Sequence, residues 1–282
     1  MATEPVASLV NNDVPSRPGN TAAPSTALNT MSTSTSTFTP TSTSMPAPTS
    51  TSTAISFTLS QSPEYSHRLA EIVSRATVTD PLDIIFQQEK TGPSTPVTPA
   101  LLYLGAKRRV DAKIAAGAFV VEACNFAAVA CWEPPASNPA PLSEEQLREV
   151  ERETPVFGRF LRHVQAAETA CFGAAAATSP PSPFHQPHWK LSLMARDPLR
   201  KDKGAVRAVI EPFVARAKAE RLPLWLVAAN ARARDVYAYF GFRVVSVVWS
   251  YPYGRDGDVR SDRDGGIDGI PSWCMVCNWP VE

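Results

Sequence analysis

Apolar residues recur along this chain with two different periods, and the period predicts which segments form helices and which form strands. Strict alternation of apolar and polar residues over 55–60 is typical of a half-buried strand. Spacings of three and four residues between apolar positions predict helices. We expect these helices from Pro63 onward, over 100–116, from Ser143 to Phe172 with a break near Pro155, after Gly204 with a kink at Pro212, and over 230–240.

Longer apolar runs between these helices predict buried strands. They cover 118–123, 126–132, 188–195, 223–229, 243–249 and 272–279. A short turn around Asn125 separates the first two runs, so we expect them to form a hairpin that Pro134 and Pro135 terminate. Strands and helices in this order predict a mixed α/β sheet.

Residues 1–54 differ from the rest of the chain because they are mostly Ser, Thr, Pro, Ala and Asn. Such a segment has too little apolar surface to offset the entropy of ordering it. We therefore expect a disordered tail over 1–54 and a folded body over 55–282. A glycosylated mucin-like stalk has the same composition, but we see no secretion signal that would favour it.

The charge and cysteine content narrow the class of protein. The 27 Lys and Arg residues balance the 27 Asp and Glu residues, so the formal net charge is zero, and bulk attraction to nucleic acid or to a membrane is not expected. Five cysteines at irregular spacing do not form the pattern of a secreted disulfide scaffold. No apolar run is long enough to cross a membrane. We expect a soluble cytoplasmic or nuclear protein.

The loop before the helix at Gly204 is a candidate anion site. Arg200, Lys201 and Lys203 place three positive charges beside a glycine at the start of a helix. Backbone N–H groups and the helix dipole attract anions there, and the cations add charge pairing. The segment could bind a diphosphate, although an ordinary solvated turn has the same composition.

Two further residues are candidates for proton transfer. Tyr237 could return a proton to a leaving thiolate, because the reference pKa values of a thiol and a phenol, about 8.5 and about 10, are nearly matched. Taken alone, it is more typical of a helix aromatic that packs on the sheet, as we expect for its neighbours Tyr239 and Phe240. Glu122 lies in an otherwise apolar strand and could deprotonate an amine, or could be a carboxylate at the edge of the sheet.

A metal site is not expected. Cys274 and Cys277 form a Cys-x-x-Cys pair, which in other proteins can mark a zinc or redox site. Here the pair falls in a predicted strand, where residues three apart point to opposite faces. The four histidines show no metal-binding spacing.

The segment from His188 to Val245 resembles the core of a GNAT-superfamily N-acetyltransferase, of the small-molecule type that is common in fungi. Four pieces carry the resemblance through their order and spacing. They are His188-Trp-Lys-Leu-Ser-Leu-Met-Ala-Arg-Asp-Pro198, Lys201-Asp-Lys-Gly204, Pro223-Leu-Trp-Leu-Val-Ala-Ala-Asn230 and Tyr237-Ala-Tyr-Phe-Gly-Phe242. The resemblance covers 55–282, with Asp80-Pro81 in the first helix region. It implies a mixed, mostly antiparallel sheet flanked by helices, with the central strand 190–195 parting from the strand 224–229.

The resemblance also implies roles for individual residues in binding acetyl-CoA. The backbone of Leu193, Met194 and Ala195 would pair with the pantetheine arm, and Asn230 would lie near it. The diphosphate would bind the loop of Arg200, Lys201, Asp202, Lys203, Gly204 and Ala205. Tyr237 would be the general acid. Two residues depart from the family pattern: Asp202 adds a negative charge to the loop, and Val206 stands where the family has a small residue.

Three functions are compatible with these features. The first is direct acetyl transfer from acetyl-CoA to the primary amine of a small molecule. The second is a GNAT-fold binding or regulatory protein with little or no catalysis, which the departures at Asp202 and Val206 would explain. The third is an acyltransferase that uses another acyl-CoA or an oxygen acceptor. Acceptor residues are not readable, because they lie in the variable loops 91–99 and 172–187.

Overall fold

The computed structural model describes residues 55–173, 186–252 and 269–280. The tail over 1–54 lies outside the described residues, as does most of the Pro-rich loop over 180–187. Disorder of the tail therefore stays a prediction.

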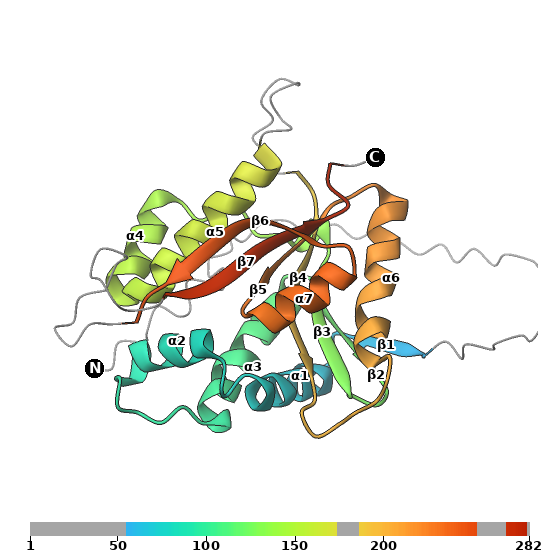
Figure 1. Ribbon diagram of the computed structural model, residues 1–282, viewed down its shortest axis with the longest axis horizontal. Coiled ribbons are helices and arrows are strands. Elements are labelled where there is room, and N and C mark those ends of the chain that lie inside the picture. Colours follow the sequence, from blue (N-terminus) through green and yellow to red (C-terminus); the bar gives the residue numbers. More distant parts are fainter. Residues whose placement is uncertain (1–54, 174–185, 253–268, 281–282) are drawn as a thin grey trace, which may run out of the picture. The chain divides into compact units, whose positions relative to one another are not determined.

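The described ranges contain seven strands and seven α-helices (Figure 1), in the order β1-α1-α2-α3-β2-β3-α4-α5-β4-α6-β5-α7-β6-β7. The strands are β1 (Phe57–Ser60), β2 (Phe119–Ala123), β3 (Ala128–Glu133), β4 (Trp189–Arg196), β5 (Leu224–Ala228), β6 (Arg243–Ser250) and β7 (Ile270–Cys277). The helices are α1 (Pro63–Ala76), α2 (Pro81–Thr91), α3 (Pro99–Ala115), α4 (Glu144–Glu153), α5 (Pro155–Gly173), α6 (Ala205–Glu220) and α7 (Ala231–Tyr239). A short 3-10 turn, η2 (Pro135–Ser137), follows β3 and confirms that the two prolines end the hairpin.

Local capping explains where most helices begin. Polar N-cap side chains accept hydrogen bonds from the first backbone N–H groups of five helices. These N-caps are Ser62 for α1, Asp80 for α2, Thr98 for α3, Ser143 for α4 and Asn230 for α7. Ser143 forms the expected capping box with Gln146, and the expected break near Pro155 separates α4 from α5.

One helix was not predicted from the apolar pattern. In α2 only Leu82 and Ile85 are buried, so its apolar residues form no clear stripe. We expected Pro212 to kink the helix after Gly204. Pro212 lies inside α6, and the helix continues past it to Glu220. Gly241, with a φ of 90°, terminates α7 as expected.

The strands form one mixed sheet in the order β1-β2-β3-β4-β5-β7-β6. Every neighbouring pair is antiparallel except β4 and β5, which are parallel. The expected hairpin is the pair β2–β3, whose turn holds Cys124, Asn125 and Phe126 at positive φ. The mixed sheet and its central strand, β4, confirm the predicted fold class.

Helices cover both faces of this sheet (Figure 1). Alternate residues of β3 point to opposite faces, and they separate two cores. Trp132 packs with α6 and α7 on the first face, where its ring stacks on Phe213 at 4.7 Å. Cys131 packs with α1 and α3 on the second face. On that same second face α5 covers β5, β6 and β7, where Cys274 belongs to the core.

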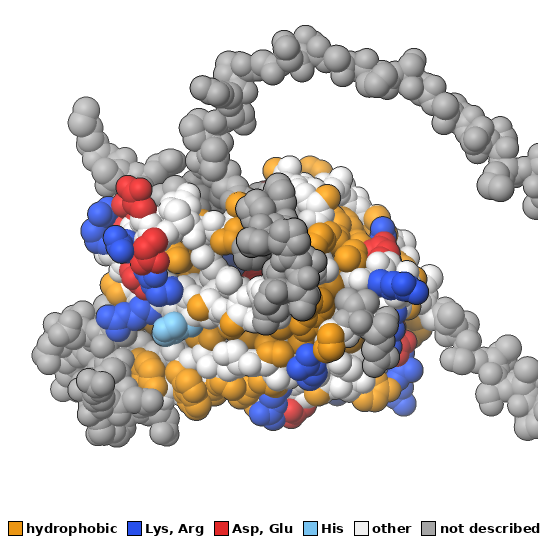
Figure 2. All heavy atoms as spheres, turned by 90° about the horizontal axis from the view of Figure 1, so that it is seen from above, with side chains coloured by type: hydrophobic (Ala, Val, Ile, Leu, Met, Phe, Trp, Pro, Cys, Tyr) orange, Lys and Arg blue, Asp and Glu red, His pale blue; other side chains and the backbone are white. Residues whose placement is uncertain are grey.

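The surface is divided by charge. Seen from above, charged side chains gather on two flanks, with hydrophobic side chains between them (Figure 2). Three large apolar side chains of the edge strand β6, Val244, Val247 and Trp249, are exposed. None of the helices in the described ranges is long and apolar enough to cross a membrane.

The Cys-x-x-Cys pair has the geometry expected of a strand. Cys274 belongs to the core of the second face and Cys277 to that of the first, so the two thiols point apart. All five cysteines are free. Within 55–173, 186–252 and 269–280, no group of three His, Cys, Asp or Glu side chains could hold a metal ion.

Candidate functional site

The parallel strands β4 and β5 pair over only three residue pairs and then part. The register runs from Trp189 opposite Leu224 to Leu191 opposite Leu226. Beyond Leu191 the strand continues to Arg196, still paired with β3 on its other side. The backbone of Leu193, Met194 and Ala195 therefore faces a gap on the side of β5, which confirms the predicted parting of the two strands.

A β-bulge explains why the strands part at this point. Trp132 pairs with Leu191 and Cys131 with Leu193, so Ser192 is an extra residue on β4. A bulge bends the strand that carries it and increases its twist. The last residue pair between β4 and β5 lies directly before this bulge. The sequence showed no sign of it, because a bulge is a mismatch between two strands rather than a property of one.

The loop between β4 and α6 is held in shape by its own polar side chains. Asp197, which is buried, accepts a hydrogen bond from the backbone N–H of Leu199 and one from Arg75 of α1. Arg200 donates from Nε and Nη2 to the carboxylate of Asp202 and from Nη1 to the carbonyl of Asn125. The hydrogen bonds from Arg200 lower the pKa of Asp202. Asp202 thus neutralises Arg200, and both residues shape the loop.

The first turn of α6 has no side-chain cap. Its N-cap is Gly204, whose φ of 82° is in the left-handed region that favours glycine. A side chain there would also collide with Ile55, because an added Cβ would lie 2.5 Å from Ile55 Cδ1. The backbone N–H groups of this turn are left for an external acceptor. Ala205, the next residue, is fully buried in the core of the first face.

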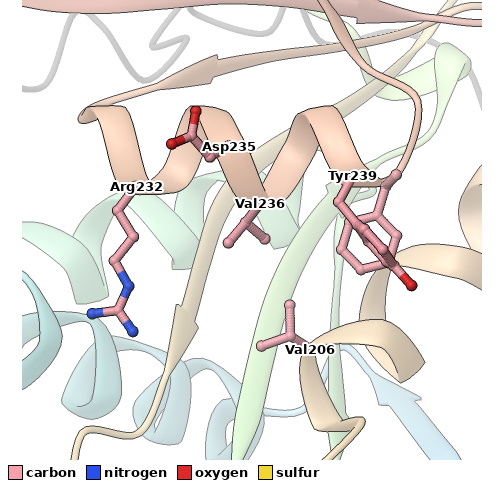
Figure 3. A pocket seen from close by; sticks show the side chains of 6 residues that line it. Val206, Arg232, Asp235, Val236 and Tyr239 are labelled. Atoms are coloured by element: carbon pink, nitrogen blue, oxygen red, sulfur yellow. The ribbon is translucent and has the colours of Figure 1, made fainter.

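A cleft separates the start of α6 from α7, and we call it the α6–α7 cleft. It consists of two adjoining cavities of about 610 and 270 Å³ that share Val206, Tyr239 and Phe240. Val236 and Tyr239 point from α7 toward α6, where Val206 faces them, and Arg232 points to the same side of α7 near its other end (Figure 3). Its remaining lining residues are Arg196, Asp202, Lys203, Gly204, Arg207 and Asp235.

Positive charge surrounds the α6–α7 cleft. The loop residue Lys203 lines it, together with Arg196, Arg207 and Arg232, which the sequence analysis did not single out. Lys201 is exposed and does not line the cleft. The helical spacing of residues 232, 235, 236 and 239 could have identified this face of α7 from the sequence, because residues three or four apart on a helix share a face.

Tyr239 does not pack on the sheet as expected. Its side chain is 68% exposed, and its hydroxyl is hydrogen-bonded to the guanidinium of Arg207. The guanidinium carbon also lies 5.6 Å from the centre of the Tyr239 ring. The packing prediction failed because residue 239 lies on the cleft side of α7, two residues from the buried Tyr237.

Tyr237 lies in the core of the first face, and burial changes its acidity. Its ring contacts Phe242 edge to face at 6.0 Å, and only 6% of the residue is exposed. Burial raises the pKa of the phenol well above its usual value. The expected near balance between phenol and thiol is therefore wrong for the protein alone. Tyr237 stays protonated and can act as a hydrogen-bond donor over the whole physiological pH range.

Asn230 occupies the end of β5, where the two strands have separated. It is the N-cap of α7, and its amide oxygen accepts a hydrogen bond from Ala233 N at 2.9 Å. Its amide nitrogen donates to Asp80 at 2.6 Å. The sequence indicates Asp80 only as part of the first helix region. Its partner Asn230 lies 150 positions away, so no local pattern links the two residues.

Glu122 is not brought to this opening. It lies on β2 with the parity of Val120, which belongs to the core of the second face, whereas Tyr237 lies on the first. Its carboxylate accepts hydrogen bonds from Thr58 Oγ1 and from the backbone N–H of Phe126. Glu122 therefore holds β1 and the β2–β3 turn in place. This position argues against the proton-abstracting role that we expected.

Comparison with known proteins finds relatives of the fold only. No family model matches the sequence, and no curated protein matches it. Among solved structures, a mosquito arylalkylamine N-acetyltransferase like 5b is 14% identical to this chain, with a TM-score of 0.51. The aligned region covers 78% of this chain and 99% of the mosquito chain. Arylalkylamine N-acetyltransferase 2 from Aedes aegypti is 14% identical, with a TM-score of 0.50 and coverages of 79% and 97%.

A third structure is the Drosophila melanogaster polyamine N-acetyltransferase that forms N-acetylagmatine. It is 12% identical, has a TM-score of 0.50, and covers 78% of this chain and 99% of its own. At such low identity the likeness concerns the fold alone. The fold of the described ranges is that of the GNAT acetyltransferases.

Proposed function

We propose that this protein transfers an acetyl group from acetyl-CoA to the primary amine of a small molecule. The observation that carries the proposal is the parting of β4 from β5 at the Ser192 bulge, directly before a loop that leads to an uncapped helix N-terminus. An open strand edge offers backbone hydrogen bonds to an extended ligand, and an uncapped helix start offers them to a phosphate.

The residues present fit acetyl-CoA in chemistry and in placement. The open edge of Leu193 to Ala195 would accept the pantetheine arm, whose amide groups need backbone partners. The first turn of α6, with Lys203, would bind the diphosphate. Arg196, Arg207 and Arg232 supply further positive charge beside the α6–α7 cleft. Arg200 contributes by shaping the loop.

Acetyl-CoA supplies an activated thioester. The amine nitrogen forms a bond to the acetyl carbon while the bond from carbon to sulfur breaks, and the amine gives its surplus proton to water. The chain positions the reactants and stabilises the developing negative charge. Tyr237, whose phenol is protonated at physiological pH and whose pKa burial raises further, would donate a hydrogen bond toward the departing sulfur.

The experiment that tests this proposal has two stages. Calorimetric titration of the full chain with acetyl-CoA should show binding, and a panel of arylalkylamines and polyamines should then release free CoA thiol. The names of the three similar structures suggest these amines. Absence of acetyl-CoA binding would refute the proposal. The same panel should include hydroxyl acceptors and longer acyl-CoA donors. Turnover of these in preference to amines and acetyl-CoA would favour an acyltransferase with another donor or an oxygen acceptor.

One observation favours a second candidate, a GNAT-fold binding protein with little catalysis. Val206 lines both cavities of the α6–α7 cleft, where its branched side chain occupies space beside the uncapped turn. Asp202 no longer supports this alternative, because Arg200 neutralises it. Tight binding of acetyl-CoA without turnover of any acceptor would favour the binding protein.

A further inference from the structure

The N-termini of α2 and α7 are joined by one hydrogen bond between two capping residues. Asn230 Nδ2 donates to Asp80 Oδ2 at 2.6 Å. Each residue also caps its own helix: Leu82 N donates to Asp80 Oδ1 at 3.0 Å, and Ala233 N donates to Asn230 Oδ1 at 2.9 Å. Both carboxylate oxygens of Asp80 and both ends of the Asn230 amide are therefore engaged.

The bond connects the two faces of the sheet where the strands have parted. Asn230 follows the end of β5, beyond its last pairing with β4. α7 places Tyr237 in the core of the first face. α2 packs through Leu82 and Ile85 against Val156 of α5, a helix of the second face.

The carboxyl group of Asp80 lies at helix ends rather than beside a cation. Only 8% of the residue is exposed, and it forms no ion pair with any described Lys or Arg side chain. Its carboxylate instead lies at the N-terminus of α2 and, through Asn230, at that of α7. The positive ends of both helix dipoles favour a negative charge there. A hydrogen bond to a buried carboxylate is also among the stronger kinds.

We propose that Asp80 and Asn230 are a positioning pair that fixes α7, and with it the phenol of Tyr237, relative to α2 and the second face. The pair rests on the proposed function in so far as Tyr237 takes part in the transfer. Neither side chain needs to touch a reacting atom. Their role is to hold α7, and with it the buried Tyr237, at a constant place relative to the second face.

The hydrogen-bond directions allow a sharp test by exchanging the two residues. Asp80→Asn alone places an NH₂ group opposite the NH₂ group of Asn230, which cannot turn without losing its bond to Ala233. Asn230→Asp alone places two carboxylates opposite each other. In the double variant Asp80→Asn/Asn230→Asp, the new amide donates to the new carboxylate. Both oxygens that cap Leu82 and Ala233 are then retained.

We expect each single variant to lower kcat roughly tenfold or more, because the donor is misplaced, and we expect Asp80→Asn to change the Kd of acetyl-CoA by less than about twofold. The double variant should recover kcat to within about threefold of the wild type. Amide hydrogen exchange across 231–239 should show the same pattern. The backbone amides should exchange fast in each single variant and should be protected again in the double variant. Exchange reports on the pair even if no acceptor is turned over.

A matched control removes a cap without touching this link. Ser143 Oγ accepts a hydrogen bond from Gln146 N at the start of α4, so Ser143→Ala should lower the melting temperature and leave kcat unchanged. The inference is overturned if amide hydrogen exchange across 231–239 is as fast in the double variant as the summed effects of the two single variants predict. It is also overturned if Ser143→Ala lowers kcat as much as they do, since loss of any cap would then suffice.

Discussion

Glu168 of α5 lies between the side chains of His188 and Lys190, and its ionisation links the stability of the fold to pH. His188 Nε2 lies 3.0 Å from Glu168 Oε1, and Lys190 Nζ lies 2.9 Å from Oε2. Burial alone would raise the pKa of this carboxyl group. Lys190 and His188 outweigh burial and lower the pKa to about 2.

Because the folded-state pKa of Glu168 is lowered, its charge stabilises the protein above the unfolded-state pKa of about 4.3, and this contribution is lost as the pH falls toward about 2. The change corresponds to roughly 3 kcal/mol. In urea unfolding, Glu168→Gln should therefore be less stable at pH 7 and should lose less stability between pH 5 and pH 3. Glu149→Gln, in a pair on the surface, serves as the control. Parallel pH curves for wild type and Glu168→Gln would contradict this account.

Tyr237 tests the proposed chemistry at one atom. Tyr237→Phe keeps the ring in the core and removes only the hydroxyl, so we expect kcat to fall roughly 10- to 1000-fold while acetyl-CoA binding hardly changes. Tyr239→Phe is the matched control: it removes a hydroxyl that Arg207 binds at the cleft, so it should affect the Kd of acetyl-CoA more than kcat. Full turnover by Tyr237→Phe, with chemistry rate-limiting, would show that water protonates the thiolate.

Among elements, the start of α6 determines the affinity for the diphosphate in the proposed function. Val206→Ala keeps helix propensity and opens the α6–α7 cleft, so it should tighten acetyl-CoA binding, whereas Lys203→Ala should weaken it about tenfold, equal to about 1.4 kcal/mol. Both are measured by calorimetry. Gly204 is a poor site for this test, because any side chain there is strained and meets Ile55. Unchanged Kd values in both variants would place the phosphates elsewhere.

The sequence predicted those elements whose causes are local. The cap at Ser143, the break at Pro155 and the glycine after α7 are each determined within a few residues, and the structure confirms them. The bulge at Ser192 and the bond between Asp80 and Asn230 depend on segments far apart in the chain. No periodicity reveals such pairings, so the site was predicted in outline while the residues that shape it were not.

On the scale of the whole molecule, the body over 55–282 should not need the tail. The Ser/Thr/Pro-rich composition of 1–54 offers little apolar surface to bury. A chain that begins at Ile55 should keep its melting temperature within about two degrees of the full chain, measured by calorimetry. Ile55 itself should be kept, since its side chain covers Gly204. A large drop in melting temperature would mean that the tail stabilises the body.

The short parallel register between β4 and β5 also has a consequence for how the chain folds. Strands β1 to β4 form one antiparallel half of the sheet and β5 to β7 the other, and three residue pairs join the halves. Each half has its own core on the second face. The crossover through α6 must close, at a cost in chain entropy, before the three residue pairs between β4 and β5 can stabilise the sheet. We therefore expect the two halves to form separately and to join late, so that the opening proposed to receive acetyl-CoA is completed in the last step of folding.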